Sequence, residues 1–110
     1  MESHKIAEDL ARELEGLTGS EIEEYVDECL EIVIIYRHSL GGSKTNPDPS
    51  GVELLISYGG PSTRVISRIG SDYLTIKVNW WDDTYETTSY APEVAAYLSE
   101  LAESYEVENV

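Results

Sequence analysis

The chain has 110 residues, and its 22 Asp and Glu against 7 Lys and Arg give a formal net charge of −15. This length suits one domain with a modest core, and an apolar content of 41% is typical of a folded chain rather than a disordered one. So few cations exclude the basic face on which direct DNA or RNA binding depends.

Two amphipathic helices are predicted at the N-terminus. Ser3 can cap the first helix, and Gly16 can end it. Its apolar stripe consists of Ile6, Leu10, Leu14 and Leu17, and its polar face carries Glu8, Asp9, Arg12, Glu13 and Glu15. The second helix begins at one of two capping-box patterns, Ser20 with Glu23 or Thr18 with Glu21.

The next segment, Glu31–Tyr36, is largely β-branched and aromatic, which predicts a strand, and we expect this strand to be central in the sheet. Ser39–Gly51 concentrates Gly, Pro, Asn and Ser and predicts a long exposed loop. Alternating apolar residues and turn signals predict three further strands, over Val52–Ser57, Thr63–Ile69 and Tyr73–Trp80.

A third amphipathic helix is predicted to begin at Pro92, with an apolar side formed by Val94, Leu98, Leu101 and Tyr105. The expected element order is therefore two helices, four strands and one helix. This order predicts a single α+β domain over residues 1–110, with an antiparallel meander of about four strands in one layer. The two N-terminal helices and the C-terminal helix form the covering layer.

The charges are unevenly distributed along the chain. Eleven acids and two bases occur through residue 31, three acids and five bases over residues 32–77, and eight acids with no base thereafter. If the helices pack side by side, their outer sides form an acidic surface that can resemble a phosphate track. The carboxylates of the second helix that we expect to bind a partner are Glu21, Glu23, Glu24, Asp27 and Glu28.

The segment Trp80–Glu86 combines two adjacent Trp residues with three carboxylates. Strand alternation places Trp80 in the core and leaves Trp81 exposed, where a large indole can serve as a recognition hot spot. The further candidate partner-binding residues are therefore Trp81, Asp82, Asp83 and Glu86.

We expect no catalytic residue, metal or cofactor. The spacing of the Asp82–Glu86 carboxylates does not match a calcium loop. Cys29 lies on an apolar helical stripe, where it behaves as a small hydrophobe, and one cysteine cannot form an internal disulfide. An enzymatic alternative would depend on His38 together with Asp82 and Glu86.

No apolar stretch approaches the ~20 residues that span a bilayer, and the N-terminal segment lacks the pattern of a signal peptide. We therefore expect a cytoplasmic protein that does not bind membranes.

The Gly-Gly-Pro turn at residues 59–61, the strand that ends in Trp-Trp-Asp at residues 80–82 and the acidic closing helix together resemble small proteins of bacterial phages and mobile elements. The resemblance extends roughly from Gly51 to Tyr105. Some proteins of this kind inhibit host defence, as anti-CRISPR proteins do. The resemblance implies a viral inhibitor that acts in the cytoplasm of the host cell.

Charge and resemblance together predict a non-enzymatic inhibitor that binds the basic nucleic-acid-binding groove of a protein as a nucleic-acid mimic. The alternative is a general protein-interaction module or homodimer that uses the aromatic residues Trp81 and Tyr85 or an uncovered apolar helix stripe. In that case the acidity serves only solubility or adaptation to salt.

Overall fold

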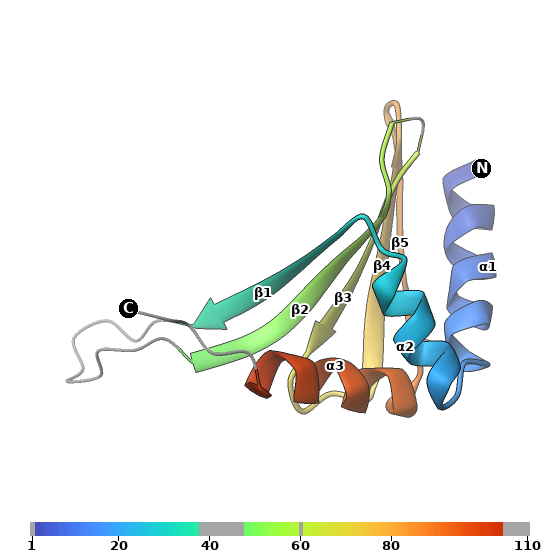
Figure 1. Cartoon of the computed structure of the whole chain (residues 1–110). Coiled ribbons are helices and arrows are strands. Elements are labelled where there is room, and N and C mark those ends of the chain that lie inside the picture. The colour runs from blue at the N-terminus through green and yellow to red at the C-terminus, as the bar shows by residue number, and fades with distance from the viewer. Residues whose placement is uncertain (1, 38–47, 60, 105–110) are drawn as a thin grey trace.

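The computed structural model describes residues 2–37, 48–59 and 61–104, which form three helices and five strands (Figure 1). The helices are α1 (Glu2–Glu15), α2 (Ser20–Asp27) and α3 (Pro92–Ser104). The strands are β1 (Glu31–Arg37), β2 (Asp48–Ser57), β3 (Ser62–Arg68), β4 (Tyr73–Trp80) and β5 (Asp83–Tyr90). The α+β class is confirmed, with five strands where about four were predicted.

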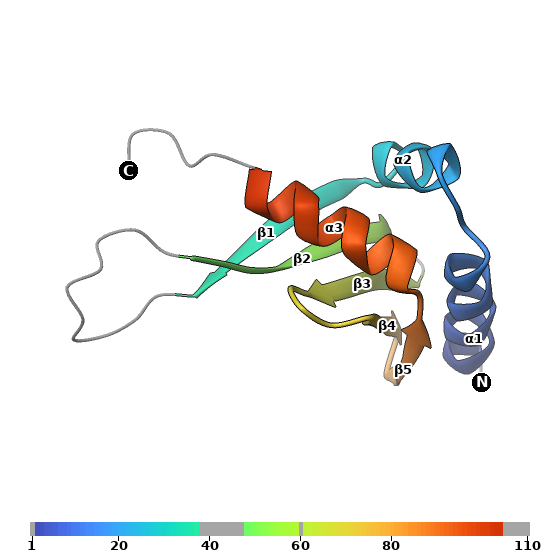
Figure 2. The same ribbon diagram turned by 90° about the horizontal axis from the view of Figure 1, so that it is seen from below.

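The strands form one antiparallel sheet in the order β1-β2-β3-β4-β5, so each strand pairs with its neighbours in sequence. The helices lie on one face of this meander, where α1 packs on β4 and β5 while α3 crosses β2, β3 and β4 (Figures 1 and 2). A single cluster of buried side chains joins all three helices to that face. The opposite face of the sheet is not covered by any helix or strand that the structure describes.

Side-chain alternation along β4 explains why one face is apolar. Leu74, Ile76 and Val78 are completely buried, whereas Lys77 between them is exposed. Ile76 stands opposite Val65 of β3, so the same alternation continues into the neighbouring strand. The predicted inward face of β4 is confirmed.

Helix α1 is held on β5 by polar contacts as well as by its apolar stripe. The hydroxyls donate in three bonds: Ser3 to the Asp83 carbonyl (3.1 Å), Tyr85 to Glu8 (3.1 Å) and Ser89 to the Ala11 carbonyl (2.9 Å). Ser3 is thus a completely buried residue inside α1, and the prediction that it caps the helix is wrong. Its hydroxyl is engaged by β5 instead of by the first turn.

The start of α2 uses the second of the two predicted capping patterns. The Thr18 backbone N–H donates to Glu21 Oε1 at 3.2 Å, while Gly19 is the N-cap residue and contributes no side-chain bond. Ser20 is already the first residue of the helix. The Thr18–Glu21 pattern is therefore the one that marks this helix end.

Strand β1 lies at an edge of the sheet, so the prediction of a central position is wrong. Its composition is typical of a strand buried on both faces, yet Ile32 and Val33 are each 41% exposed. Its partner β2 begins at Asp48, which shortens the predicted loop Ser39–Gly51. The rest of that loop, through residue 47, lies outside the described residues.

The additional strand β5 consists of Thr, Ser, Tyr and acidic residues, which show no apolar alternation. Its exposure nevertheless alternates along the strand, and Ser89 on the helix-covered side is buried. Thr and Tyr favour β-strands, and this preference was the feature of the sequence that indicated β5.

Candidate acidic interaction surface

The five carboxylates predicted on the second helix are exposed on α2 and on its C-cap residue Glu28. No lysine or arginine of the described chain lies within ion-pair distance of them. Glu21 accepts hydrogen bonds from Thr18, and the other four point into solvent without such a partner. Among the described residues, no cation therefore compensates these five carboxylates.

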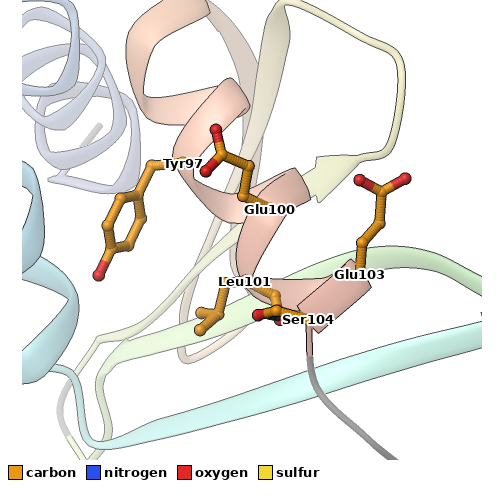
Figure 3. A pocket seen from close by; sticks show the side chains of 5 residues that line it. All are labelled: Tyr97, Glu100, Leu101, Glu103 and Ser104. Carbon is orange, nitrogen blue, oxygen red and sulfur yellow. Dashed lines mark hydrogen bonds between the residues drawn. The ribbon is translucent and has the colours of Figure 1, made fainter.

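Helix α3 continues this acidic region, and Tyr97 marks the place where the two helices meet. The phenol ring of Tyr97 points away from α3 towards α2 (Figure 3). Partial burial raises the pKa of Tyr97, and the negative charges of Glu23 and Asp27 raise it further. Two α2 carboxylates are thus close enough to act on an α3 side chain.

Next to Tyr97 the surface forms a hollow of about 530 Å³. Its other lining residues are Glu100, Leu101, Glu103 and Ser104, all on α3 (Figure 3). We call the region formed by Glu23, Asp27, Tyr97, Glu100 and Glu103 the α2–α3 acidic surface. Neither helix contains a lysine or arginine.

Helix α1 contributes less to this surface than its sequence suggests. Asp9 is neutralised locally, because Lys5 and Arg12 each lie 3.0 Å from its carboxylate and hold its pKa below the usual range. Glu8 and Glu15 accept hydrogen bonds from β5. Glu8 is half-buried against β5, so the expectation that it belongs to the exposed polar face is wrong, whereas Glu15 remains exposed.

Glu13 is the α1 carboxylate that faces α2. Burial raises the pKa of Tyr25 on α2 above its usual range, and the charge of Glu13 raises it further. The acidic region therefore extends from α1 through α2 to α3.

The second group of predicted residues lies at the β4–β5 hairpin, far from α2. This hairpin is near the N-terminal end of α1, where Asp83 binds Ser3, whereas α2 follows the C-terminal end of α1 (Figure 1). A helix of 14 residues is about 21 Å long. The predicted residues thus form two groups rather than one. The prediction did not include the α3 carboxylates Glu100 and Glu103, although the excess of acids in the C-terminal third of the chain indicated them.

At the hairpin, Trp81 is 88% exposed, as predicted. Trp80 is only half-buried and does not belong to the core cluster, so the prediction that it is a core residue is wrong. Asp82 is exposed beside Trp81. Glu86 lies opposite Lys77 on the uncovered face of the sheet, with 4.0 Å between their charged atoms. Trp81 has a backbone φ of 58°, a left-handed conformation that bulky residues rarely adopt.

Replacing Trp81 by glycine is expected to raise the free energy of unfolding by about 1 kcal/mol, because glycine adopts positive φ without strain and an exposed indole contributes little packing. Thermal or urea unfolding measures the change. The control is Thr84→Gly, at an exposed position of β5, which is expected to lower stability by a similar amount. Equal losses in both variants would show that the indole packs on the protein.

The sheet does not neutralise the helices. On its uncovered face Arg64 lies 3.4 Å from Glu53 of the neighbouring strand, and Lys77 is engaged with Glu86. Both ion pairs are internal to the sheet. The negative charge is therefore concentrated on the helical side of the molecule.

Little in the described residues points to catalysis. Cys29 is half-buried, its thiol donates to the Tyr25 carbonyl at 3.4 Å, and burial raises its pKa, which keeps it protonated. His4 packs edge-on against Tyr85, while His38 lies outside the described residues. Within residues 2–37, 48–59 and 61–104, no three His, Cys, Asp or Glu side chains are grouped to hold a metal.

None of the described helices is long and apolar enough to cross a membrane. No protein-family model, curated protein or solved structure matches this chain.

Proposed function

We propose that the protein is a non-enzymatic inhibitor that binds the basic nucleic-acid-binding groove of another protein through the α2–α3 acidic surface. The resemblance to small acidic phage proteins suggests a host-defence complex as the target, as for anti-CRISPR proteins, in the cytoplasm of the host cell. The protein would act by occupying the groove as a mimic of nucleic acid.

One observation carries this proposal: two adjacent helices present carboxylates around Tyr97 and contain no lysine or arginine. Glu23 and Asp27 stand one helical turn apart, as do Glu100 and Glu103, so the charges form short rows. Rows of like charge destabilise the isolated protein slightly and favour a cationic partner. A groove that binds phosphates supplies such cations.

The hollow beside Tyr97 adds contacts that a purely charged surface lacks. Leu101 offers apolar area, and the raised pKa of Tyr97 keeps its hydroxyl protonated, so it can donate a hydrogen bond. Aromatic side chains next to charges are frequent anchors of protein interfaces. The α2–α3 acidic surface therefore combines electrostatic attraction with a place for an inserted side chain.

The test compares two triple variants with the same change in net charge. The surface variant carries Glu23→Gln, Asp27→Asn and Glu100→Gln. The matched control variant carries Glu31→Gln, Glu53→Gln and Asp72→Asn, which lie on the sheet and its turns, outside both candidate surfaces. Labelled target DNA is bound to CRISPR effector complexes, and each protein is titrated as a competitor. We expect the surface variant to need a roughly tenfold higher concentration, since three exposed charge pairs are lost.

The control variant is expected to compete as well as the unchanged protein. Competition by the unchanged protein should weaken steeply when the salt is raised from about 0.05 to 0.2 M. Binding that survives replacement of all five α2 carboxylates by Lys in a folded protein would rule out mimicry by α2.

A second candidate function is that of a general protein-interaction module that binds its partner through Trp81. The indole of Trp81 is exposed, and its backbone is strained. Strained backbone persists where the surrounding structure enforces it, such positions cluster at functional sites, and tryptophan is frequent at interface hot spots. This alternative predicts binding that depends little on salt. It also predicts loss of binding in Trp81→Gly and not in the α2–α3 triple variant.

A further inference from the structure

The edge strand β1 has the composition of a core strand but the exposure of a surface strand. Five consecutive residues, 32–36, are Ile, Val or Tyr, with no proline and no charge among them. Leu30, just before the strand, is 62% exposed. An uncovered apolar edge offers backbone N–H and C=O groups for pairing with another strand, and folded proteins normally block such edges.

The opposite edge of the sheet shows how this protein blocks an edge. Strand β5 is polar, carries Glu86 in its middle, and is covered on one side by α1 (Figure 1). Beside β1, by contrast, α2 lies only near the start of the strand, and no described helix runs along the rest of its outer side (Figure 2). The two edges therefore differ in the protection that the described chain gives them.

Beside β1 there is a second, mainly apolar hollow of about 540 Å³. It is lined by Ile32, Val33, Ile34, Tyr36 and Leu101. Helix α3 crosses β2 to β4, so its residue Leu101 only borders this region. Ile34 packs against the core, whereas Ile32, Val33 and the hollow beside them are exposed in the described structure.

We propose that a second copy of the chain pairs with this edge, β1 against β1 in antiparallel orientation, with the symmetry axis at Ile34. In this register Ile34 stands opposite Ile34 of the second copy, and Val33 opposite Ile35. The ends of the strand bring Glu31 opposite Arg37 twice, once on each side of the axis. The two five-stranded sheets become one continuous sheet of ten strands.

The order of charges along β1 favours a second copy as the occupant. The strand begins with Glu31 and ends with Arg37, with apolar and aromatic residues between them. Antiparallel self-pairing matches these opposite charges, whereas parallel pairing would set like charges side by side. The irregularity in the β1–β2 register is one extra residue, Ser50, so the bulge lies in β2 and not in β1.

This arrangement places the helices of both copies on the same side of the joined sheet, because the axis between antiparallel strands is perpendicular to the sheet. Two copies of net charge −15 repel each other at long range, and salt screens that repulsion. Dimerisation is therefore expected to strengthen with salt. Binding to a cationic groove is expected to weaken with salt, so the two proposals fail independently.

Cysteine cross-linking tests the register in a Cys29→Ala background. Opposed residues of an antiparallel pair have Cα atoms about 4.5–5.5 Å apart, within the reach of a disulfide. Ile34→Cys is expected to give a disulfide-linked dimer under mild oxidation. The control Ile32→Cys should not, because residue 32 of each copy lies about four residues, or ~13 Å, from its equivalent.

Charge exchange tests the same register in solution. Sedimentation at about 0.5 M salt, where repulsion is screened, should give the mass of a dimer. Glu31→Arg and Arg37→Glu should each weaken dimerisation roughly tenfold, since two matched pairs become like-charged. The double exchange should restore it, an outcome that a general loss of folding would not give.

A chain that sediments as a monomer throughout the micromolar range would overturn the proposal. Equal cross-linking at positions 32 and 34 would exclude the stated register. If the chain dimerises only after removal of residues 105–110, its own C-terminus occupies the edge, which also overturns the proposal.

Discussion

Replacing Leu98 by alanine is expected to lower the free energy of unfolding by about 2–5 kcal/mol, the range for buried leucines. Leu98 is completely buried and belongs to the cluster that joins α3 to the sheet. Alanine keeps the helix propensity, so the loss comes from missing apolar contacts and from the cavity left behind. Small domains have only about 5–15 kcal/mol of stability, so this change removes a large fraction.

The matched control is Leu101→Ala, one turn further along α3, where the side chain is only partly buried. It is expected to cost clearly less than Leu98→Ala in urea unfolding at equal protein concentration. Equal losses at the two positions would show that α3 is rotated relative to the structure described above.

Replacing Gly51 by alanine is expected to destabilise the fold by about 2–3 kcal/mol through overpacking. Gly51 is buried on β2, and a Cβ added there would lie 2.5 Å from the Ser67 carbonyl oxygen of β3. That obstacle is backbone, so relief requires β2 and β3 to separate or the bulge beside Gly51 to change. Thermal unfolding monitored by circular dichroism measures the loss.

Gly16→Ala serves as the control for this prediction. Its added Cβ would meet carbonyl oxygens no closer than 3.7 Å, an ordinary contact. The expected change is within about 0.5 kcal/mol, or a small gain because alanine reduces the entropy of the unfolded chain. If Gly51→Ala were equally harmless, the close approach of β2 and β3 would be wrong.

Periodicity and turn residues predicted most elements, because they act locally. The apolar spacing around Leu98 and the proline at position 92 identified α3, and alternation identified the inward face of β4. The charge of the candidate surface was also predictable, since α2 and α3 contain no cations. Strand β5 was not predicted, because its polar residues are stabilised by contacts with α1, which is distant in sequence.

The sequence alone therefore determined the α+β class, the position of most helices and strands and the excess of carboxylates over cations. Tertiary structure decided which carboxylates share a surface. Glu15 bonds to β5 while Glu23 and Glu100 lie near Tyr97, and these placements depend on how helices pack on the sheet. It also decided that β1 is an edge strand, because strand order arises from pairing between distant segments, whereas composition records only how apolar a strand is.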